Sequence, residues 1–102
     1  MPNMIVYENL LRGFEEKLPT FTVRVVVPGE MFALQSVRDG AARSVVITVD
    51  RDALNAMGTP EALNLAIGLA LTTMARDPGA DSLVIDPDGD GGFKVGRFPR
   101  PQ

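Results

Sequence analysis

The chain contains neither cysteine nor histidine, and these two absences exclude most of the common catalytic and metal-binding arrangements. Without cysteine there is no disulfide, no thiolate nucleophile and no thiolate ligand for a metal ion. Without histidine the chain lacks the commonest general base and the commonest zinc ligand. Serine–histidine–aspartate and cysteine–histidine groups therefore cannot form within it. We expect a protein that is not an enzyme, that binds no cofactor and whose fold depends on packing alone.

The chain also lacks a basic charge excess and any long hydrophobic run. Its formal net charge is −3, whereas a general nucleic-acid-binding protein is usually basic. No apolar stretch is long enough to cross a bilayer, and the first residues do not resemble a secretory signal. We therefore expect a cytoplasmic protein without membrane contact. Arginine supplies eight of the ten basic residues, which is a compositional hint of a bacterial or phage source.

The composition is that of one ordered domain, which we place at residues 1–102. Hydrophobic residues make up 45% of the chain and charged residues 23%, close to the averages of globular proteins. Apolar residues at alternating spacings of three and four predict an amphipathic helix from Asn3, its cap, to about Lys17. Asp50 is typical of the cap of a short helix, and Thr59-Pro60-Glu61 predicts the start of a second long helix.

Alternating and β-branched apolar residues predict five strands. These strands cover about residues 21–27, 31–38, 43–49, 83–85 and 93–98. Pro28 and Gly29 occupy the central positions of a type II turn between the first two strands. The predicted order is α-β-β-β-α-β-β. This order predicts the α+β class, with an antiparallel sheet of four or five strands and the helices packed on one face.

The segment DPDGDGG, which starts at Asp86, is the most specific short motif. The carboxylates of Asp86, Asp88 and Asp90 stand at alternate positions before a glycine, which is how calcium-binding loops begin. A tight loop can direct alternate oxygens toward a hard cation. The motif thus makes a small calcium-binding module one hypothesis for this chain.

The same segment departs from a calcium loop further along. Lys94 stands at the ninth position and Arg97 at the twelfth, where a bidentate glutamate is needed. Two apparent strands flank the segment, whereas two helices flank an EF-hand loop. Pro-Asp-Gly is in addition a favourable turn sequence, because proline fixes φ and glycine accepts a positive φ. We interpret the segment as a hairpin turn, with cation binding as the alternative.

Two surfaces carry more apolar residues than one-sided burial requires. In the second long helix, the predicted core face consists of Leu63, Ile67, Ala70, Leu71 and Met74. Leu65 and Leu69 point nearly the opposite way, and residues 62–75 include no charged residue. On the sheet, the alternation places Val26 and Val46 on the face that points away from the helices. We expect the first helix, a second subunit or another protein to cover the two leucines, and we predict all four side chains as candidate interface residues.

A nucleic-acid-binding domain is a further alternative, because the first five elements follow the α-β-β-β-α order of double-stranded RNA-binding domains. Such domains need basic residues at the start of the second helix, and residues 59–64 contain none. The remaining cations that could contact phosphate are Arg24, Arg38, Arg43, Arg97 and Arg100. The low basic content disfavours this reading.

The leading hypothesis is a non-enzymatic protein–protein interaction module that acts as a homodimer. The absence of catalytic residue types and the surplus apolar surface are the two observations behind it. An adaptor, a chaperone and an inhibitor all fit these observations. The element order is also shared with dimeric secretion chaperones, and this likeness concerns the fold alone.

Overall fold

The computed structural model describes residues 3–38, 40–89 and 91–97. In this part of the chain three helices and five strands follow one another as α1 (Met4–Lys17), β1 (Thr22–Val27), β2 (Met31–Arg38), β3 (Ala41–Val49), α2 (Arg51–Asn55), α3 (Pro60–Arg76), β4 (Ser82–Asp88) and β5 (Gly92–Arg97). The α+β class and the predicted order of elements are confirmed.

The five strands form a single sheet in the order β1-β2-β3-β4-β5. The pairs β1–β2, β2–β3 and β4–β5 are antiparallel, as expected for strands joined by short turns. The pair β3–β4 is parallel, so the sheet is mixed, and the prediction of a wholly antiparallel sheet is wrong at this pair. This pair follows from the long connection through α2 and α3, which returns the chain to the end of the sheet where β3 began.

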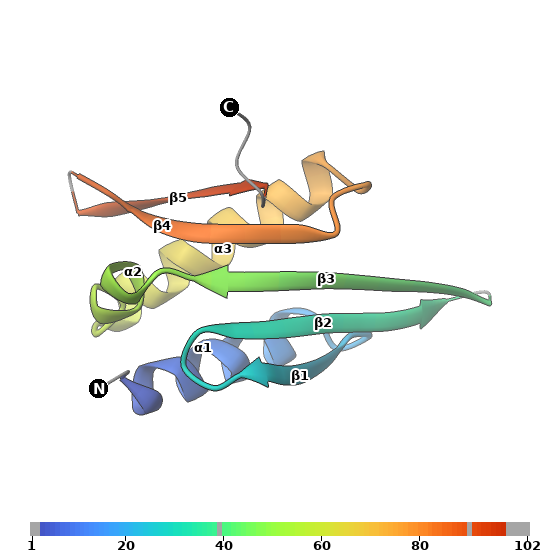
Figure 1. The fold of residues 1–102 in the computed structure, drawn as a ribbon, viewed down its shortest axis with the longest axis horizontal. Helices are drawn as coiled ribbons and strands as arrows, with labels where there is room; N and C mark the ends of the chain where they lie inside the picture. The colour runs from blue at the N-terminus through green and yellow to red at the C-terminus, as the bar shows by residue number, and fades with distance from the viewer. Residues whose placement is uncertain (1–2, 39, 90, 98–102) are drawn as a thin grey trace.

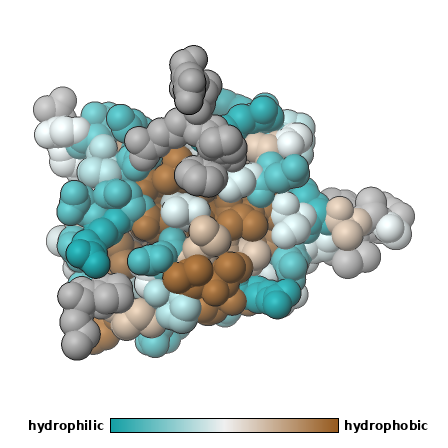
Figure 2. Space-filling model, viewed as in Figure 1, coloured by the Kyte–Doolittle hydropathy of each residue, from teal (hydrophilic) through white to brown (hydrophobic). Residues whose placement is uncertain are grey.

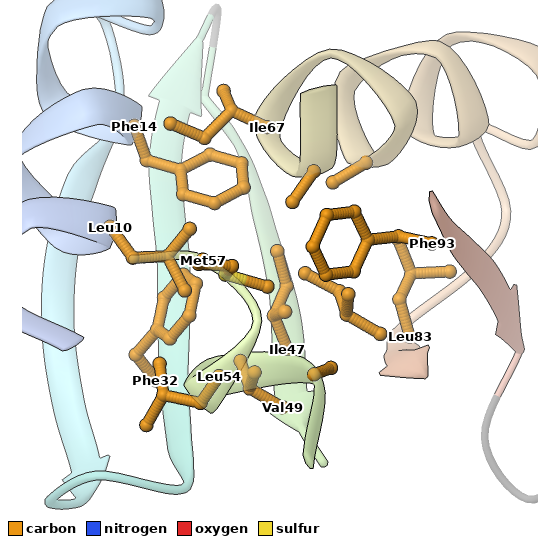
Figure 3. Packing of buried hydrophobic residues seen from close by; sticks show 14 of the residues in the cluster. Leu10, Phe14, Phe32, Ile47, Val49, Leu54, Met57, Ile67, Leu83 and Phe93 are labelled. Atoms are coloured by element: carbon orange, nitrogen blue, oxygen red, sulfur yellow. The ribbon is translucent and has the colours of Figure 1, made fainter. Parts of the chain in front are cut away.

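The helices lie on one side of the sheet (Figure 1). Side chains from α1, α3 and one face of the sheet converge in the space between them (Figure 3). The rings of Phe14 on α1 and Phe32 on β2 lie 5.4 Å apart between their centroids. Alternation along the strands sends every second side chain into this core. The largest fully buried side chains are Tyr7, Phe14, Phe32, Leu10, Leu34, Ile47, Leu54, Ile67, Leu83, Ile85 and Val45.

The predicted helix caps and the first turn are confirmed. The side-chain oxygens of Asn3, Asp50 and Thr59 accept hydrogen bonds from backbone N–H groups two or three residues further on, at 3.3, 3.0 and 3.2 Å. The N–H of Glu30 donates to the carbonyl of Val27 at 3.0 Å, and Gly29 has a φ of 80°. This positive φ is the reason why the turn needs glycine at that position.

Gly13 is the point of close approach between α1 and α3. A Cβ atom built on Gly13 would lie 2.3 Å from Cδ1 of Ile67, which is too near for two carbon atoms. The next nearest atom, Cγ1 of the same isoleucine, would be at 3.6 Å, an ordinary contact. Glycine therefore allows the two helices to approach while Ile67 stays in the core.

This contact predicts a coupling between Gly13→Ala and Ile67→Val. Cδ1 is the end of the Ile67 side chain, but this side chain is buried and has little room to move away. In the wild type, the strain should therefore exceed the helix-propensity gain of about 1 kcal/mol, so Gly13→Ala lowers the free energy of unfolding. Valine lacks Cδ1, so in the Ile67→Val background the same change should raise it by roughly 0.5–1 kcal/mol. Urea unfolding of the four proteins measures the coupling. Additivity within about 0.5 kcal/mol would contradict the contact.

Candidate functional site

One face of the sheet has no helix on it in the described part of the chain (Figure 1). The strand registers place Arg24, Ala33 and Val46 side by side on this uncovered face. Ala33 is almost fully buried, yet it does not belong to the core cluster on the helix side. Figure 2 shows hydrophobic residues gathered in the middle of this side of the molecule, with hydrophilic residues toward its borders.

A shallow hollow of about 360 Å³ lies on this face, toward β1. It brings together Val26 and Val46, two of the four predicted interface residues. The side chain of Val26 is 47% exposed, whereas that of Val46 is half-buried. The residues that line the hollow are Arg24, Val25, Val26, Ala33, Gln35, Ser44 and Val46.

The other two predicted interface residues lie on the opposite side of the molecule, on α3. Leu65 is 47% exposed, while Leu69 is half-buried and packs against the core cluster. The two leucines therefore differ in environment, and neither shares a surface with the hollow. Sequence periodicity also placed Leu63 in the core, whereas the structure leaves it half-buried at the border and buries Ala66.

A second hollow, of about 230 Å³, lies where the β1–β2 turn meets the start of α2. Its charged lining residues are Glu30, Asp50 and Arg51. Asp50 is already engaged as the cap of α2, with its carboxylate 3.0 Å from a backbone nitrogen. The hollow is smaller than most ligand pockets, which measure roughly 300–1,000 Å³.

The acidic segment forms a β-hairpin, since β4 and β5 pair antiparallel. The strand β4 extends to Asp88, beyond the predicted end at Ile85, so Asp86 and Asp88 belong to a strand and share its uncovered face. Asp90 lies outside the described residues. Within the described ranges, no three Asp, Glu, Cys or His side chains form a group that could hold a metal ion.

The arginines proposed for nucleic-acid binding do not form one described surface. Arg24 lies on the uncovered face, whereas Arg43 reaches from β3 to the carbonyl of Met74 at 3.4 Å, near the end of α3. A cation at this helix end interacts favourably with the carbonyl dipoles. Arg97 binds Asp77, and the side chains of Arg38 and Arg100 lie outside the described part.

Arg97 and Asp77 form a bidentate ion pair that links the end of β5 to the residue after α3. Nε and Nη2 of the guanidinium donate to the two carboxylate oxygens of Asp77. These hydrogen bonds and the attraction between the charges lower the pKa of Asp77 and raise that of Arg97. Both groups are substantially exposed, so solvent screens the pair.

Comparison with known protein families, characterised proteins and solved structures found no match to this chain. Among the described residues, no helix has both the length and the hydropathy that a membrane span requires.

The ion pair predicts a pH dependence that Asp77→Asn should reduce. The pKa of Asp77 is lowered in the folded state, so the pair stabilises the protein above the unfolded pKa of about 3.9. This stabilisation is lost as the pH falls through the lower, folded value. Wild-type melting temperatures should therefore decline more steeply than those of Asp77→Asn between pH 5 and pH 2. Asp88→Asn, a change at an exposed carboxylate, serves as the control; equal slopes for all three proteins would contradict the prediction.

For the acidic hairpin we predict weak calcium binding, with a dissociation constant above roughly 10 µM, because the bidentate glutamate of calcium loops is absent. Isothermal titration at physiological salt measures it, with Asp88→Asn as the matched control. Melting temperatures in calcium and in chelator should agree. Tighter binding that Asp88→Asn removes would make the hairpin a cation site.

Proposed function

We propose that this chain is a non-enzymatic protein–protein interaction domain that acts as a homodimer. Its contact surface lies around Val26, on the β1 side of the sheet, with Val46 in it or at its border. The observation that carries the proposal is the hollow beside β1, where apolar side chains remain accessible on a face without a helix. An adaptor, a chaperone or an inhibitor would each act through such a surface.

The make-up of the hollow supports a protein partner. Antiparallel sheets that leave one face in water usually carry polar residues there. Here valine and alanine line the hollow together with Arg24, Gln35 and Ser44. Protein interfaces commonly combine apolar and polar side chains in this way.

The absence of catalytic groups supports a non-enzymatic role. The chain contains no histidine or cysteine. Among the described carboxylates, Asp50 caps a helix and Asp77 binds Arg97. These contacts give both side chains structural roles.

Light scattering across a tenfold dilution series tests the proposal. We expect a dimer at the highest concentration, and we expect Val26→Glu to shift it to monomer, because an unpaired charge would enter an apolar contact. Leu65→Glu is the matched control, since both side chains are 47% exposed in the described structure and Leu65 lies on α3. A wild-type monomer at every concentration would overturn the homodimer. A dimer that Leu65→Glu dissociates, and Val26→Glu does not, would move the contact to α3.

A further inference from the structure

The hollow beside β1 is lined by apolar and polar side chains whose arrangement follows from the strand registers. Arg24, Ala33 and Val46 form one row across β1, β2 and β3. In the neighbouring row Gln35 pairs with Ser44, so two neutral polar side chains lie on one side of the first row. The hollow therefore offers hydrogen-bonding groups and apolar area next to each other.

Ala33 explains why the surface is hollowed at this point. Its side chain is a single methyl group, whereas its neighbours in the row, Arg24 and Val46, carry longer side chains. Val26 lies two residues after Arg24 along β1 and adds an apolar side chain that is 47% exposed. The volume of about 360 Å³ lies within the range of roughly 300–1,000 Å³ that ligand pockets occupy.

Arg24 is the single charged side chain that lines the hollow. It is exposed, and it forms no ion pair with any residue of the described part of the chain. The described carboxylates of the uncovered face, Asp86 and Asp88, belong to β4, three strand spacings or about 14 Å from β1. At physiological salt the Debye length is about 8 Å, so their attraction to Arg24 is largely screened. The hollow thus presents a positive charge beside an apolar floor.

The shape of the hollow favours a segment of a protein over a free small molecule. A site for a small molecule usually encloses roughly 70–90% of the surface of its ligand. This hollow is shallow and lies on a sheet face without a helix, so it can enclose a side chain only in part (Figure 1). A protein segment makes further contacts with the surface around the hollow, and these contacts add to the binding energy.

We propose that the hollow binds a segment of a partner protein in which an aliphatic side chain stands within two residues of an aspartate or a glutamate. The aliphatic side chain would lie over Ala33, against Val26 and Val46. The carboxylate would accept two parallel hydrogen bonds from the guanidinium of Arg24, a geometry that arginine favours. This inference rests on the proposed protein–protein contact at the hollow and names the chemistry of the partner.

The segment and a second copy of the chain would compete for this surface, because the proposed homodimer also uses Val26. An excess of the bound segment should therefore shift a dimer toward monomer in light scattering. The two proposals fail separately. A wild-type monomer at every concentration overturns the homodimer and leaves the hollow accessible to the segment, whereas loss of the acidic preference overturns the present inference alone.

Selection from a displayed library of random linear peptides tests the preference on the full chain. We expect the enriched peptides to carry an aspartate or glutamate within two positions of a valine, isoleucine or leucine, and Arg24→Glu should not bind them. Arg12→Glu, the same change at an exposed arginine of α1, is the matched control and should bind them as the wild type does. The absence of enriched peptides, or equal binding by Arg24→Glu, overturns the proposal.

A charge exchange separates direct contact with Arg24 from an indirect effect of the substitution. In fluorescence polarisation, Arg24→Glu should weaken binding of an enriched peptide about tenfold or more, with the melting temperature kept. A peptide with lysine in place of its acidic residue should regain affinity for Arg24→Glu and lose affinity for the wild type. Ala33→Leu, which fills the floor, should weaken the original peptide. Failure of the lysine peptide to restore binding overturns the contact, and octanoate that binds as tightly as the peptide overturns the protein segment as the occupant.

Discussion

Two long helices can cover only one face of a five-stranded sheet, and this constraint determines which surfaces of the protein remain accessible. The helices α1 and α3 lie on the same side and approach each other closely at Gly13 and Ile67. Their contact closes the core over the sheet, with large side chains such as Phe14 and Phe32 fully buried. The described residues place no further helix on the other face or along β1. The accessible hollow on the other face follows from this unequal coverage.

Features that depend on neighbouring residues could be predicted from the sequence. Asn3 and Thr59 cap helices, and Pro28 with Gly29 forms the first turn, because each structure needs only a few residues to form. The parallel pairing of β3 with β4 could not be predicted in the same way. Hydrophobic alternation is the same for parallel and antiparallel neighbours, and the direction of β4 depends on the path of the chain over the sheet.

The residues of the candidate surfaces could likewise be predicted from the sequence only in part. Val26 and Val46 were predicted from alternation, and the structure brings both to one hollow. On α3 the pattern predicted Leu63 in the core and missed Ala66. Periodicity gives weight to large side chains, whereas the structure fully buries this small one and leaves Leu63 half-buried. The acidic hairpin was predicted, but β4 continues to Asp88 past the end of its pairing with β3, where Pro87 removes no hydrogen bond to β3.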